Sequence, residues 1–358
     1  MAVVKRRLWK MDKKKILKEL SRYKIGTCAE MIYRNALFYP EHECITSGET
    51  RLTFAEFNAR VNRLVNALSK MGLKKGDVIG ALSWNSVRYL ELFGAAMKGG
   101  FIISPYNARL NENEAAYLIN YSTARVVFVG EDHMAMARTL RRMGLCPEKY
   151  VALDVDDPEM ISYETFLSES PDEEPGIDID ENDPIFIIYT SGTTGTPKGA
   201  VYSHKGFIGD CNTYVMMTGI QPEAKYVMIM PLFHIGGTKV MWSYFYVGGT
   251  IVILPTFNAE DTLKVIEREK ATDIHIVPTH LSAFFAVKNF EKYDLLSIQR
   301  MWYAASPMPQ EHLKRGLDIW GPIFIQGYGS AETGPNVTSL SNNEHKVVGL
   351  CLRKRRKD

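Results

Sequence analysis

One stretch of eleven residues, 189–199, restricts what this chain can fold into more than any other feature. It reads Tyr-Thr-Ser-Gly-Thr-Thr-Gly-Thr-Pro-Lys-Gly and follows a short apolar run, Ile185–Ile188, that predicts a buried strand. The stretch holds three glycines, five Ser/Thr hydroxyls and one lysine, Lys198. Glycines let backbone N–H groups approach an anion, while the hydroxyls add donors and Lys198 adds a positive charge. This composition predicts a phosphate-binding loop. An ordinary polar turn is the weaker interpretation, because later motifs fit the same chemistry.

The stretch is not the common P-loop. That loop requires Gly-x-x-x-x-Gly-Lys-Ser/Thr, in which the hydroxyl after the lysine is placed on magnesium. Here Pro197 precedes Lys198 and Gly199 follows it, so both neighbouring positions differ. A different class of nucleotide-binding protein is therefore indicated.

The stretch resembles the signature loop of the AMP-forming adenylating enzymes, which include acyl-CoA synthetases, luciferases and the adenylation domains of peptide synthetases. Residues 231–237 resemble that family's Pro-x-x-His-x-x-Gly segment, 303–307 its turn against the adenine, and 327–333 its Tyr-Gly-x-Thr-Glu motif. Residues 72–91 are similar to the early helix–turn–strand region, which is weaker support. The resemblance extends over roughly residues 28 to 349.

The resemblance implies a role for each matching residue. The implied catalytic residues are Lys198, His234 and Glu332, and Glu332 is also the implied Mg²⁺ ligand. The implied phosphate-binding residues are Thr190, Ser191, Gly192, Thr193, Thr194, Gly195 and Lys198. The implied adenine-binding residues are Ala305, Ser306 and Tyr328. The implied acyl pocket consists of His234, Gly236, Thr238, Met241 and Trp242.

Two alternatives stay open at these positions, and one position departs from the family pattern. A histidine beside apolar residues is commonly a satisfied core histidine, although the spacing favours a functional His234. The segment from Thr238 to Tyr246 is rich in Met, Trp and Tyr and would suit an apolar or aromatic acid, but it could equally be helix core. Ala331 stands where the family has a threonine that contacts phosphate, so phosphate affinity or rate is expected to be reduced.

The expected fold class is α/β. The resemblance implies the large N-terminal adenylating domain of acyl-CoA synthetases, with two stacked β-sheet lobes flanked by helices in an αβαβα order. We expect one AMP-binding domain over 1–349, with interleaved lobes at about 67–215 and at 25–66 plus 216–342. The sequence also predicts a helix over Phe54–Met71, started by a Thr53/Glu56 capping box, and an acidic linker without a packed core over Glu169–Asp183.

The family's β-barrel subdomain and C-terminal lid find no match in this sequence. Residues 350–358 form a basic tail that resembles nothing in the family. We interpret the chain as a truncated member whose C-terminus arises from a frameshift or an early stop. A tail that directs the chain to a nucleus or a membrane is the alternative.

The implied reaction has two steps and uses ATP, Mg²⁺ and coenzyme A. A carboxylate, fatty or aromatic, attacks the α-phosphorus of ATP to give acyl-AMP and pyrophosphate, and a thiol then displaces AMP. Catalysis of the first step depends on holding two anions together and offsetting their charge. The alternatives are an adenylating domain that serves an acceptor other than CoA, and a catalytically incomplete nucleotide-binding fragment.

Charge and cysteine content bear on partners and compartment. Residues 1–24 carry ten Lys/Arg and two Asp/Glu, and the tail is also basic, so the body of the chain is acidic although the net charge is +2. No basic, aromatic-interleaved pattern supports nucleic-acid binding, and at most a peripheral membrane contact is expected. Five scattered cysteines without a Cys-x-x-Cys favour reduced thiols in the cytoplasm. A homodimer stays open.

Overall fold

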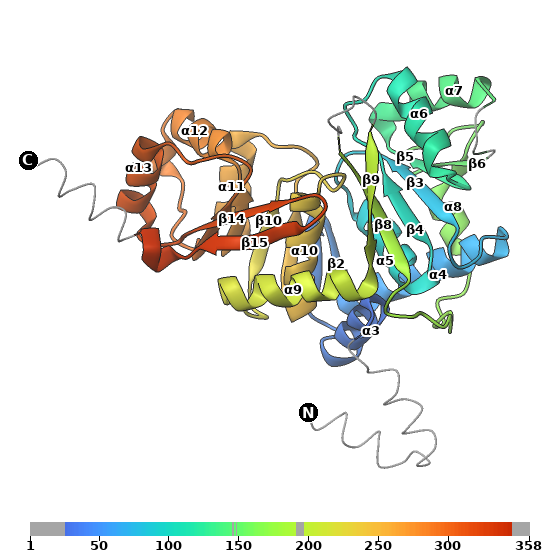
Figure 1. The fold of residues 1–358 in the computed structure, drawn as a ribbon, viewed down its shortest axis with the longest axis horizontal. Coiled ribbons are helices and arrows are strands. Elements are labelled where there is room, and N and C mark those ends of the chain that lie inside the picture. Colours follow the sequence, from blue (N-terminus) through green and yellow to red (C-terminus); the bar gives the residue numbers. More distant parts are fainter. Residues whose placement is uncertain (1–25, 145–146, 148, 191–196, 346–358) are drawn as a thin grey trace, which may run out of the picture.

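The structure, a computed structural model, describes residues 26–144, 147, 149–190 and 197–345. Two β-sheets stand side by side with helices between them and outside them (Figure 1). The expected α/β class with two sheets is therefore confirmed.

The first sheet has eight strands in the order β15-β14-β13-β12-β10-β11-β1-β2. These strands are β1 (Glu43–Ser47), β2 (Thr50–Thr53), β10 (Lys225–Met228), β11 (Thr250–Ile253), β12 (Asp273–Ile276), β13 (Arg300–Tyr303), β14 (Phe324–Ser330) and β15 (Gly334–Leu340). Neighbours are parallel except at the two edges, where β1–β2 and β14–β15 are antiparallel. Residues from both ends of the chain thus share one sheet.

The second sheet has seven strands in the order β7-β6-β5-β3-β4-β8-β9. These strands are β3 (Val78–Leu82), β4 (Ile102–Pro105), β5 (Val126–Val129), β6 (Lys149–Ala152), β7 (Ile161–Ser162), β8 (Pro184–Thr190) and β9 (Lys198–Ser203). All pairs are parallel except β8–β9. The apolar runs in β3 and β5 are fully buried, as expected for parallel strands covered on both faces.

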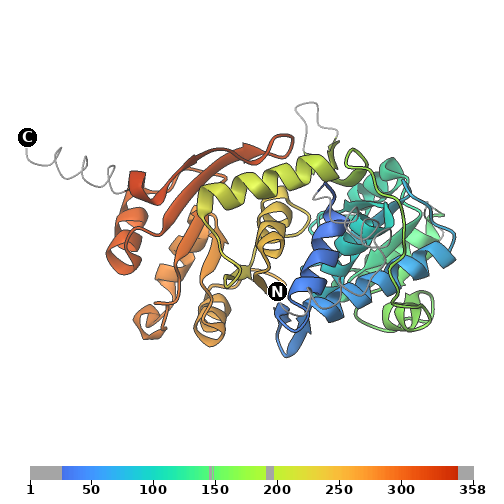
Figure 2. The same ribbon diagram turned by 90° about the horizontal axis from the view of Figure 1, so that it is seen from below.

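The helices form three layers around the two sheets (Figures 1 and 2). Between the sheets lie α3 (Cys28–Phe38), α4 (Phe54–Lys70), α5 (Val87–Gly99), α9 (His204–Thr218) and α10 (Ile235–Val247). Outside the second sheet lie α6 (Glu112–Ser122) and α7 (Met134–Arg142), and outside the first lie α11 (Ala259–Glu269), α12 (Pro278–Ala286) and α13 (Gln310–Trp320). Together with α8 (Tyr163–Ser168), which packs on α4, these helices complete the expected αβαβα order.

The middle helical layer forms one continuous core with both sheets. This cluster contains Ile45 and Met228 from the first sheet and Ile79 and Phe186 from the second. Burying large apolar side chains at one shared interface makes the two sheets a single packed unit. Among the described residues, no helix combines the length and the apolar character that crossing a bilayer requires.

The N-terminus of α4 follows the sequence prediction. The Thr53 hydroxyl accepts a hydrogen bond from the Glu56 N–H at 3.2 Å, and the Glu56 carboxylate accepts one from the Thr53 N–H at 2.8 Å. This reciprocal pair satisfies two N–H groups that would otherwise lack partners. Thr27 is the N-cap of α3, which begins at Cys28.

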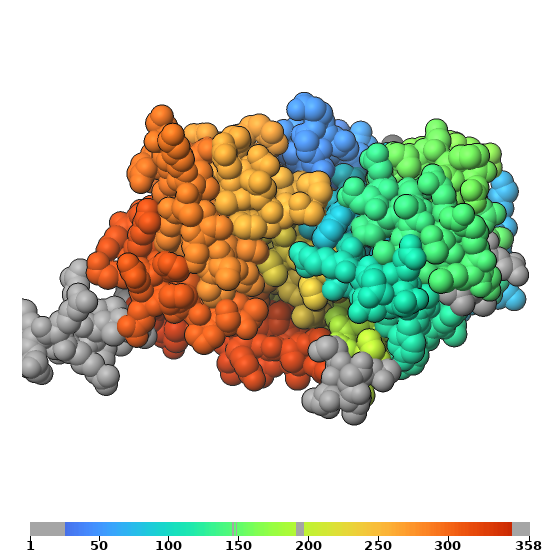
Figure 3. All heavy atoms as spheres, turned by 90° about the horizontal axis from the view of Figure 1, so that it is seen from above, coloured from blue at the N-terminus to red at the C-terminus, as the bar shows by residue number. Residues whose placement is uncertain are grey.

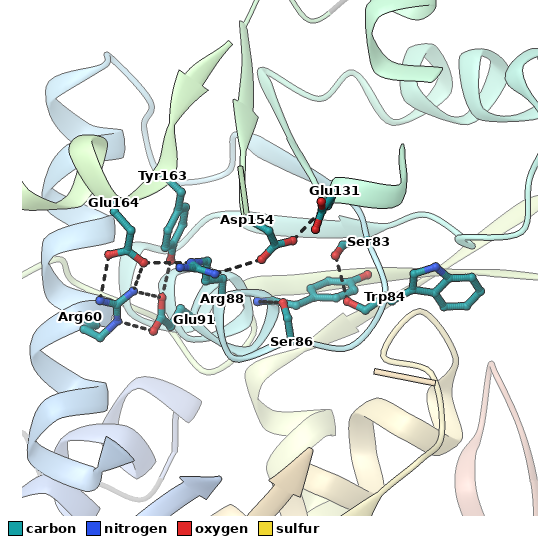
Figure 4. A network of polar contacts seen from close by, with 11 residues as sticks. Arg60, Ser83, Trp84, Ser86, Arg88, Glu91, Glu131, Asp154, Tyr163 and Glu164 are labelled. Atoms are coloured by element: carbon teal, nitrogen blue, oxygen red, sulfur yellow. Dashed lines mark hydrogen bonds and ion pairs between the residues drawn. The ribbon is translucent and has the colours of Figure 1, made fainter. Parts of the chain in front are cut away.

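A polar network ties α4 and α5 to α8 on the side of the second sheet (Figure 4). Arg60 of α4 binds the buried Glu91 of α5 at 2.6 Å and Glu164 of α8 at 2.9 Å. Tyr163 donates a 2.6 Å hydrogen bond to Glu91, and Arg88 bridges Glu164 and Asp154. Burial raises the pKa of the Glu91 carboxyl, although Arg60 and Tyr163 oppose this shift.

The acidic linker corrects one sequence expectation. Residues 169–183 contain no helix or strand, as predicted, but they are not free of the core. Asn66 of α4 donates to the Pro171 carbonyl at 2.8 Å, and the buried Lys98 of α5 pairs with Glu174 at 2.7 Å. Ile177 packs against the core between the sheets. The linker is therefore fixed along α4 and α5 by donors that composition alone does not reveal.

Candidate functional site

The predicted site segments gather at the carboxyl ends of the parallel strands. The loops after β10, β13 and β14 in the first sheet, and after β3, β4 and β8 in the second, carry or adjoin these segments. Ligands of open α/β sheets bind outside the carboxyl ends of the strands. Figure 3 shows the two halves meeting along a furrow, with the segment near residue 250 (gold) on one side and the segment near residue 110 (teal) on the other.

The phosphate-loop candidate joins β8 to β9. Thr190 ends β8 and is paired directly with Lys198, which begins β9 and is exposed. A Cβ atom on Gly199 would lie 2.5 Å from Ile187, so a larger residue at position 199 would push against β8. The predicted phosphate-binding residues between the two strands lie outside the described residues: Ser191, Gly192, Thr193, Thr194 and Gly195.

A tight turn presents His234 at the start of α10. The His234 N–H donates to the Pro231 carbonyl at 3.1 Å, and the Thr238 hydroxyl donates to the Leu232 carbonyl at 2.5 Å. A Cβ atom on Gly237 would lie 2.1 Å from the Pro231 carbonyl oxygen, so this turn requires glycine. The Pro-x-x-His-x-x-Gly pattern therefore has a geometric basis, and the predicted acyl-pocket residue Thr238 uses its hydroxyl within the turn.

His234 is exposed, with an aromatic ring against it and a guanidinium nearby. Its ring centroid lies 4.9 Å from that of Phe233, which in turn lies 6.2 Å from Trp84. The Arg109 guanidinium carbon lies 5.5 Å from the centroid of Trp84 and 6.0 Å from that of Phe233. Partial burial, and then the Arg109 charge, lower the pKa of His234. The imidazole is thus neutral at pH 7 and able to accept or donate a hydrogen bond.

Asn85 connects the His234 turn to the second sheet, although it belongs to no motif recognised in the sequence. This buried side chain follows β3 and donates to the Met230 carbonyl at 3.1 Å and to the Leu254 carbonyl at 3.2 Å. Its amide oxygen accepts a hydrogen bond from the Leu232 N–H at 2.9 Å. Asn85 therefore fixes the segment leading to His234. The feature of the sequence that could have pointed to Asn85 is a polar residue shortly after a fully apolar strand.

The β14–β15 hairpin presents Tyr328 and Glu332. The Tyr328 residue is 71% exposed, so its ring is free to stack on a flat ligand. The Ser330 hydroxyl accepts hydrogen bonds from the N–H groups of Glu332 and Thr333, each at 3.3 Å. The Ser330 hydroxyl and a backbone N–H hold the pKa of the Glu332 carboxyl below its usual value. A Cβ atom on Gly329 would lie 2.0 Å from the carbonyl oxygen of Gly334, which explains the glycine.

The hairpin turn lies against β9. The Tyr202 hydroxyl donates to the Ala331 carbonyl, and Ala331 packs against the core between the sheets. Figures 1 and 2 both show the hairpin tip beside β8 and β9. The turn that carries Glu332 thus lies near the strand that begins at Lys198.

The predicted adenine turn follows β13. Ala305 has a left-handed backbone with φ = 72°, which is unusual for a residue other than glycine. Ala305 and Ser306 are both exposed. A strained, exposed turn at the carboxyl end of a parallel strand fits a surface that a flat ligand contacts closely.

The predicted acyl-pocket residues do not share one environment. Gly236 is partly exposed at the start of α10, whereas Met241 and Trp242 are fully buried farther along that helix. The Trp242 ring lies 6.4 Å from Phe57 and 5.0 Å from Phe245, which is the packing of a core residue.

Glu332 fits one position of a Mg²⁺ site. Mg²⁺ in nucleotide sites is held by one or two carboxylates together with phosphate oxygens and water. Glu332 is exposed and charged at neutral pH. No group of three His, Cys, Asp or Glu side chains suited to a metal occurs within the described ranges.

The chain resembles curated enzymes over most of its length. A feruloyl-CoA synthase of an Amycolatopsis species is 30% identical over 320 residues, which cover 86% of this chain and 60% of that enzyme. An indoleacetate–CoA ligase of Aromatoleum aromaticum is 31% identical over 309 residues, with the same two coverages. The chain therefore spans about 60% of the length of these relatives.

Solved structures share the fold. The inhibitor-bound N-terminal domain of FACL13 from Mycobacterium tuberculosis has a TM-score of 0.83 and 25% identity, and the match covers 90% of this chain and 80% of that domain. An anthranilate CoA ligase in complex with anthranoyl-AMP has a TM-score of 0.84 at 24% identity, covering 88% of this chain and 62% of that one. The latter likeness supports the fold alone.

The chain also matches a protein family over most of its length, including the site segments at the strand ends. Residues 32–354 match the family described as AMP-binding enzyme, a span that includes every predicted site residue. The chain belongs to the AMP-binding enzyme family.

Proposed function

We propose that this protein binds ATP and a carboxylic acid, joins them as an acyl-adenylate with release of pyrophosphate, and passes the acyl group to coenzyme A. The observation that supports this proposal most is that Lys198, His234 and Glu332 lie in or at the end of the segments that follow β8, β10 and β14, at the carboxyl ends of these strands. The named activities of the relatives, feruloyl-CoA synthase and indoleacetate–CoA ligase, agree with it.

Each residue has a part that its position allows. The Lys198 ammonium offsets phosphate charge beside the loop, and the Tyr328 ring stacks on the adenine. Glu332 would hold Mg²⁺, which neutralises charge on the phosphates when it is bound. His234, neutral and next to Phe233, would border the meeting point of the acid and the nucleotide. Three unpaired thiols in the described residues, Cys28, Cys44 and Cys211, support a reducing compartment such as the cytoplasm.

The test is ATP–pyrophosphate exchange on the full chain with Mg²⁺ and a panel of aliphatic and aromatic acids. We expect exchange that depends on the acid, and a loss of about 100-fold in Lys198→Ala, since the lysine offsets charge that develops during transfer. Lys314→Ala is the matched control, because Lys314 is exposed on α13 and pairs only with Asp318 among the described residues.

A folded chain that binds ATP without any exchange would contradict acid activation and favour the catalytically incomplete nucleotide binder. Exchange without thioester formation would favour an acceptor other than CoA. Equal activities of Lys198→Ala and Lys314→Ala would remove Lys198 from the phosphate site.

A further inference from the structure

A groove lies between α3 and the acidic linker, at the point where the described chain begins. Its volume is about 990 Å³, and it is lined by Gly26, Thr27 and the start of α3 on one side and by residues 174–182 on the other. The linker leads into β8 at Pro184, so the groove lies at the amino end of that strand, whereas the candidate site lies at the carboxyl ends. The groove is therefore separate from the site described above.

The groove is acidic, and part of its negative charge is unpaired. Its lining within the described residues has one ammonium, that of Lys98, and five carboxylates: Glu30, Glu174, Asp178, Asp180 and Glu181. Glu174 pairs with Lys98 at 2.7 Å, and Glu181 pairs with Lys205 at 2.8 Å. Asp178 and Asp180 are exposed, and neither carboxylate forms an ion pair with a residue that the structure describes. The groove thus carries negative charge that a cationic segment would offset.

The walls of the groove are fixed and partly apolar. Ile177 packs against the core between the sheets, and a Cβ atom on Gly100 would lie 3.0 Å from the Ile179 side chain. The Glu30 carboxylate accepts hydrogen bonds from the N–H groups of Gly26 at 3.0 Å and of Thr27 at 3.3 Å, which fixes the point where the preceding segment joins the groove. A groove whose walls are already ordered loses little freedom when a ligand binds.

The segment that precedes Gly26 has the complementary charge. Residues 1–24 carry ten Lys/Arg and two Asp/Glu, with apolar residues such as Trp9 and Leu17 among them. Because this segment is joined to the groove at Gly26, its binding there is intramolecular, with an effective concentration on the order of 1 mM. An affinity of about 0.1 mM is then enough to keep the groove about nine-tenths filled.

We propose that residues 1–25 of this chain dock in the groove between α3 and the linker, with Lys and Arg side chains placed against Asp178 and Asp180. The charge of the groove repels an anionic membrane or nucleic acid, and the segment of a second copy competes only when the protein concentration approaches the effective concentration. Docking holds the cations of the segment on the chain's own carboxylates and so withholds them from other anionic surfaces. High salt weakens such a contact, because exposed charges are screened over about 3 Å at 1 M.

The test is limited digestion of the full chain with chymotrypsin, with cleavage after Trp9 followed by mass spectrometry. The cleavage rate tracks the undocked fraction when docking is in rapid exchange. A synthetic peptide of residues 1–25, digested in the same buffers, gives the rate for an undocked segment. We expect cleavage in the chain to be about tenfold slower than in the peptide at about 20 mM salt, and the two rates to converge at about 1 M salt.

A charge-neutral variant of the groove tests the location. Asp178→Asn combined with Asp180→Asn removes two charges while keeping the shape of both side chains, and should speed cleavage after Trp9 about threefold at low salt. The matched control, Glu112→Gln combined with Asp132→Asn, removes two exposed charges from the outer side of the second sheet and should leave the rate unchanged. The midpoint of urea denaturation serves as the measure of correct folding in both variants.

Three outcomes would overturn the docking. The first is cleavage in the natural chain as fast as in the peptide at low salt, and the second is an equal rate in the natural chain and the groove variant. The third is protection that increases with protein concentration, which would show that the groove takes the segment of a second copy. None of these measurements uses ATP or an acid, so the proposed function stands or falls separately.

Discussion

Ala305 shows strain at a single residue. Its φ of 72° lies in the left-handed region, where an L-residue with a Cβ atom costs about 1–2 kcal/mol. The residue follows β13 in the predicted adenine turn and is exposed, so no packing accounts for the alanine. We predict that Ala305→Gly raises the free energy of unfolding by about 0.5–1 kcal/mol, measured by urea denaturation. The gain is smaller than the strain because glycine gains more freedom in the unfolded chain.

The neighbouring alanine supplies the control. Ala304 has no positive φ, so Ala304→Gly should lower the free energy of unfolding by about 0.5–1 kcal/mol through the same entropy term. Equal losses in both variants would show that the Ala305 backbone is not strained.

Individual site residues could be predicted where a motif has a local geometric cause. Position 237 requires glycine because the Pro231 carbonyl occupies the place of a side chain, and this constraint acts over only six residues of the chain. Asn85 could not be found in this way. It acts on carbonyls about 145 and 169 positions away, and no local spacing encodes that contact. The same holds for Arg109, which reaches Phe233 from the other sheet.

At the scale of elements, α9 and α10 are linked by a buried ion pair. Lys239 of α10 pairs with Asp210 of α9, and the two side chains are 2% and 26% exposed. The ammonium also lies 3.8 Å from the centroid of the Tyr202 ring. Burial lowers the pKa of Lys239 to about 7. The pair lies next to Gly334, at the base of the hairpin that carries Glu332.

We predict that Asp210→Ala lowers the free energy of unfolding by about 2–3 kcal/mol, because it leaves a buried charge without its partner. This is less than for a fully buried pair, since Asp210 retains some contact with water. Adding Lys239→Met to Asp210→Ala should restore part of the loss. Urea denaturation measures both values.

An exposed pair on α11 gives the comparison. Lys264 and Glu260 are four residues apart and more than half exposed, so Glu260→Ala should lower the free energy of unfolding far less than Asp210→Ala does. If Asp210→Ala costs as little as Glu260→Ala, the Lys239 ammonium has another way to satisfy its charge.

Elements with a strong local pattern were predictable, and elements fixed by distant partners were not. The helix predicted over Phe54–Met71 occurs as α4, since its apolar spacing and its capping box act within the helix. The contacts of the acidic linker over 169–183 could not be predicted from its composition. They depend on donors elsewhere in the chain: Asn66, which binds a linker carbonyl, and Lys98, which pairs with Glu174. The two-sheet architecture followed from the family resemblance, not from the pattern of any one strand.

At the scale of the whole molecule, two buried neutral histidines make folding depend on pH. His204 begins α9, is fully buried and accepts a hydrogen bond from the Cys28 N–H of α3 at 3.1 Å. His275 lies on β12 and is 2% exposed. Burial lowers the pKa of His204 to about 4 and that of His275 to about 3. Folding therefore holds both rings neutral in a range where the unfolded chain protonates them.

The direction of the effect follows from proton binding. Below a pH of about 6.5, the unfolded state binds more protons at these two histidines than the folded state does. Their contribution to the free energy of unfolding is therefore complete above that pH and is lost as the pH falls toward the folded-state pKa values of about 4 and 3. We predict that the free energy of unfolding decreases between pH 7 and pH 5 by up to about 2 kcal/mol for each histidine. In His275→Leu the decrease should be smaller by that amount, measured by urea denaturation at both values. Leu281→Ala removes a buried side chain without a titratable group, so its cost should be the same at both pH values. An unchanged pH dependence in His275→Leu would mean that His275 takes up a proton in the folded state.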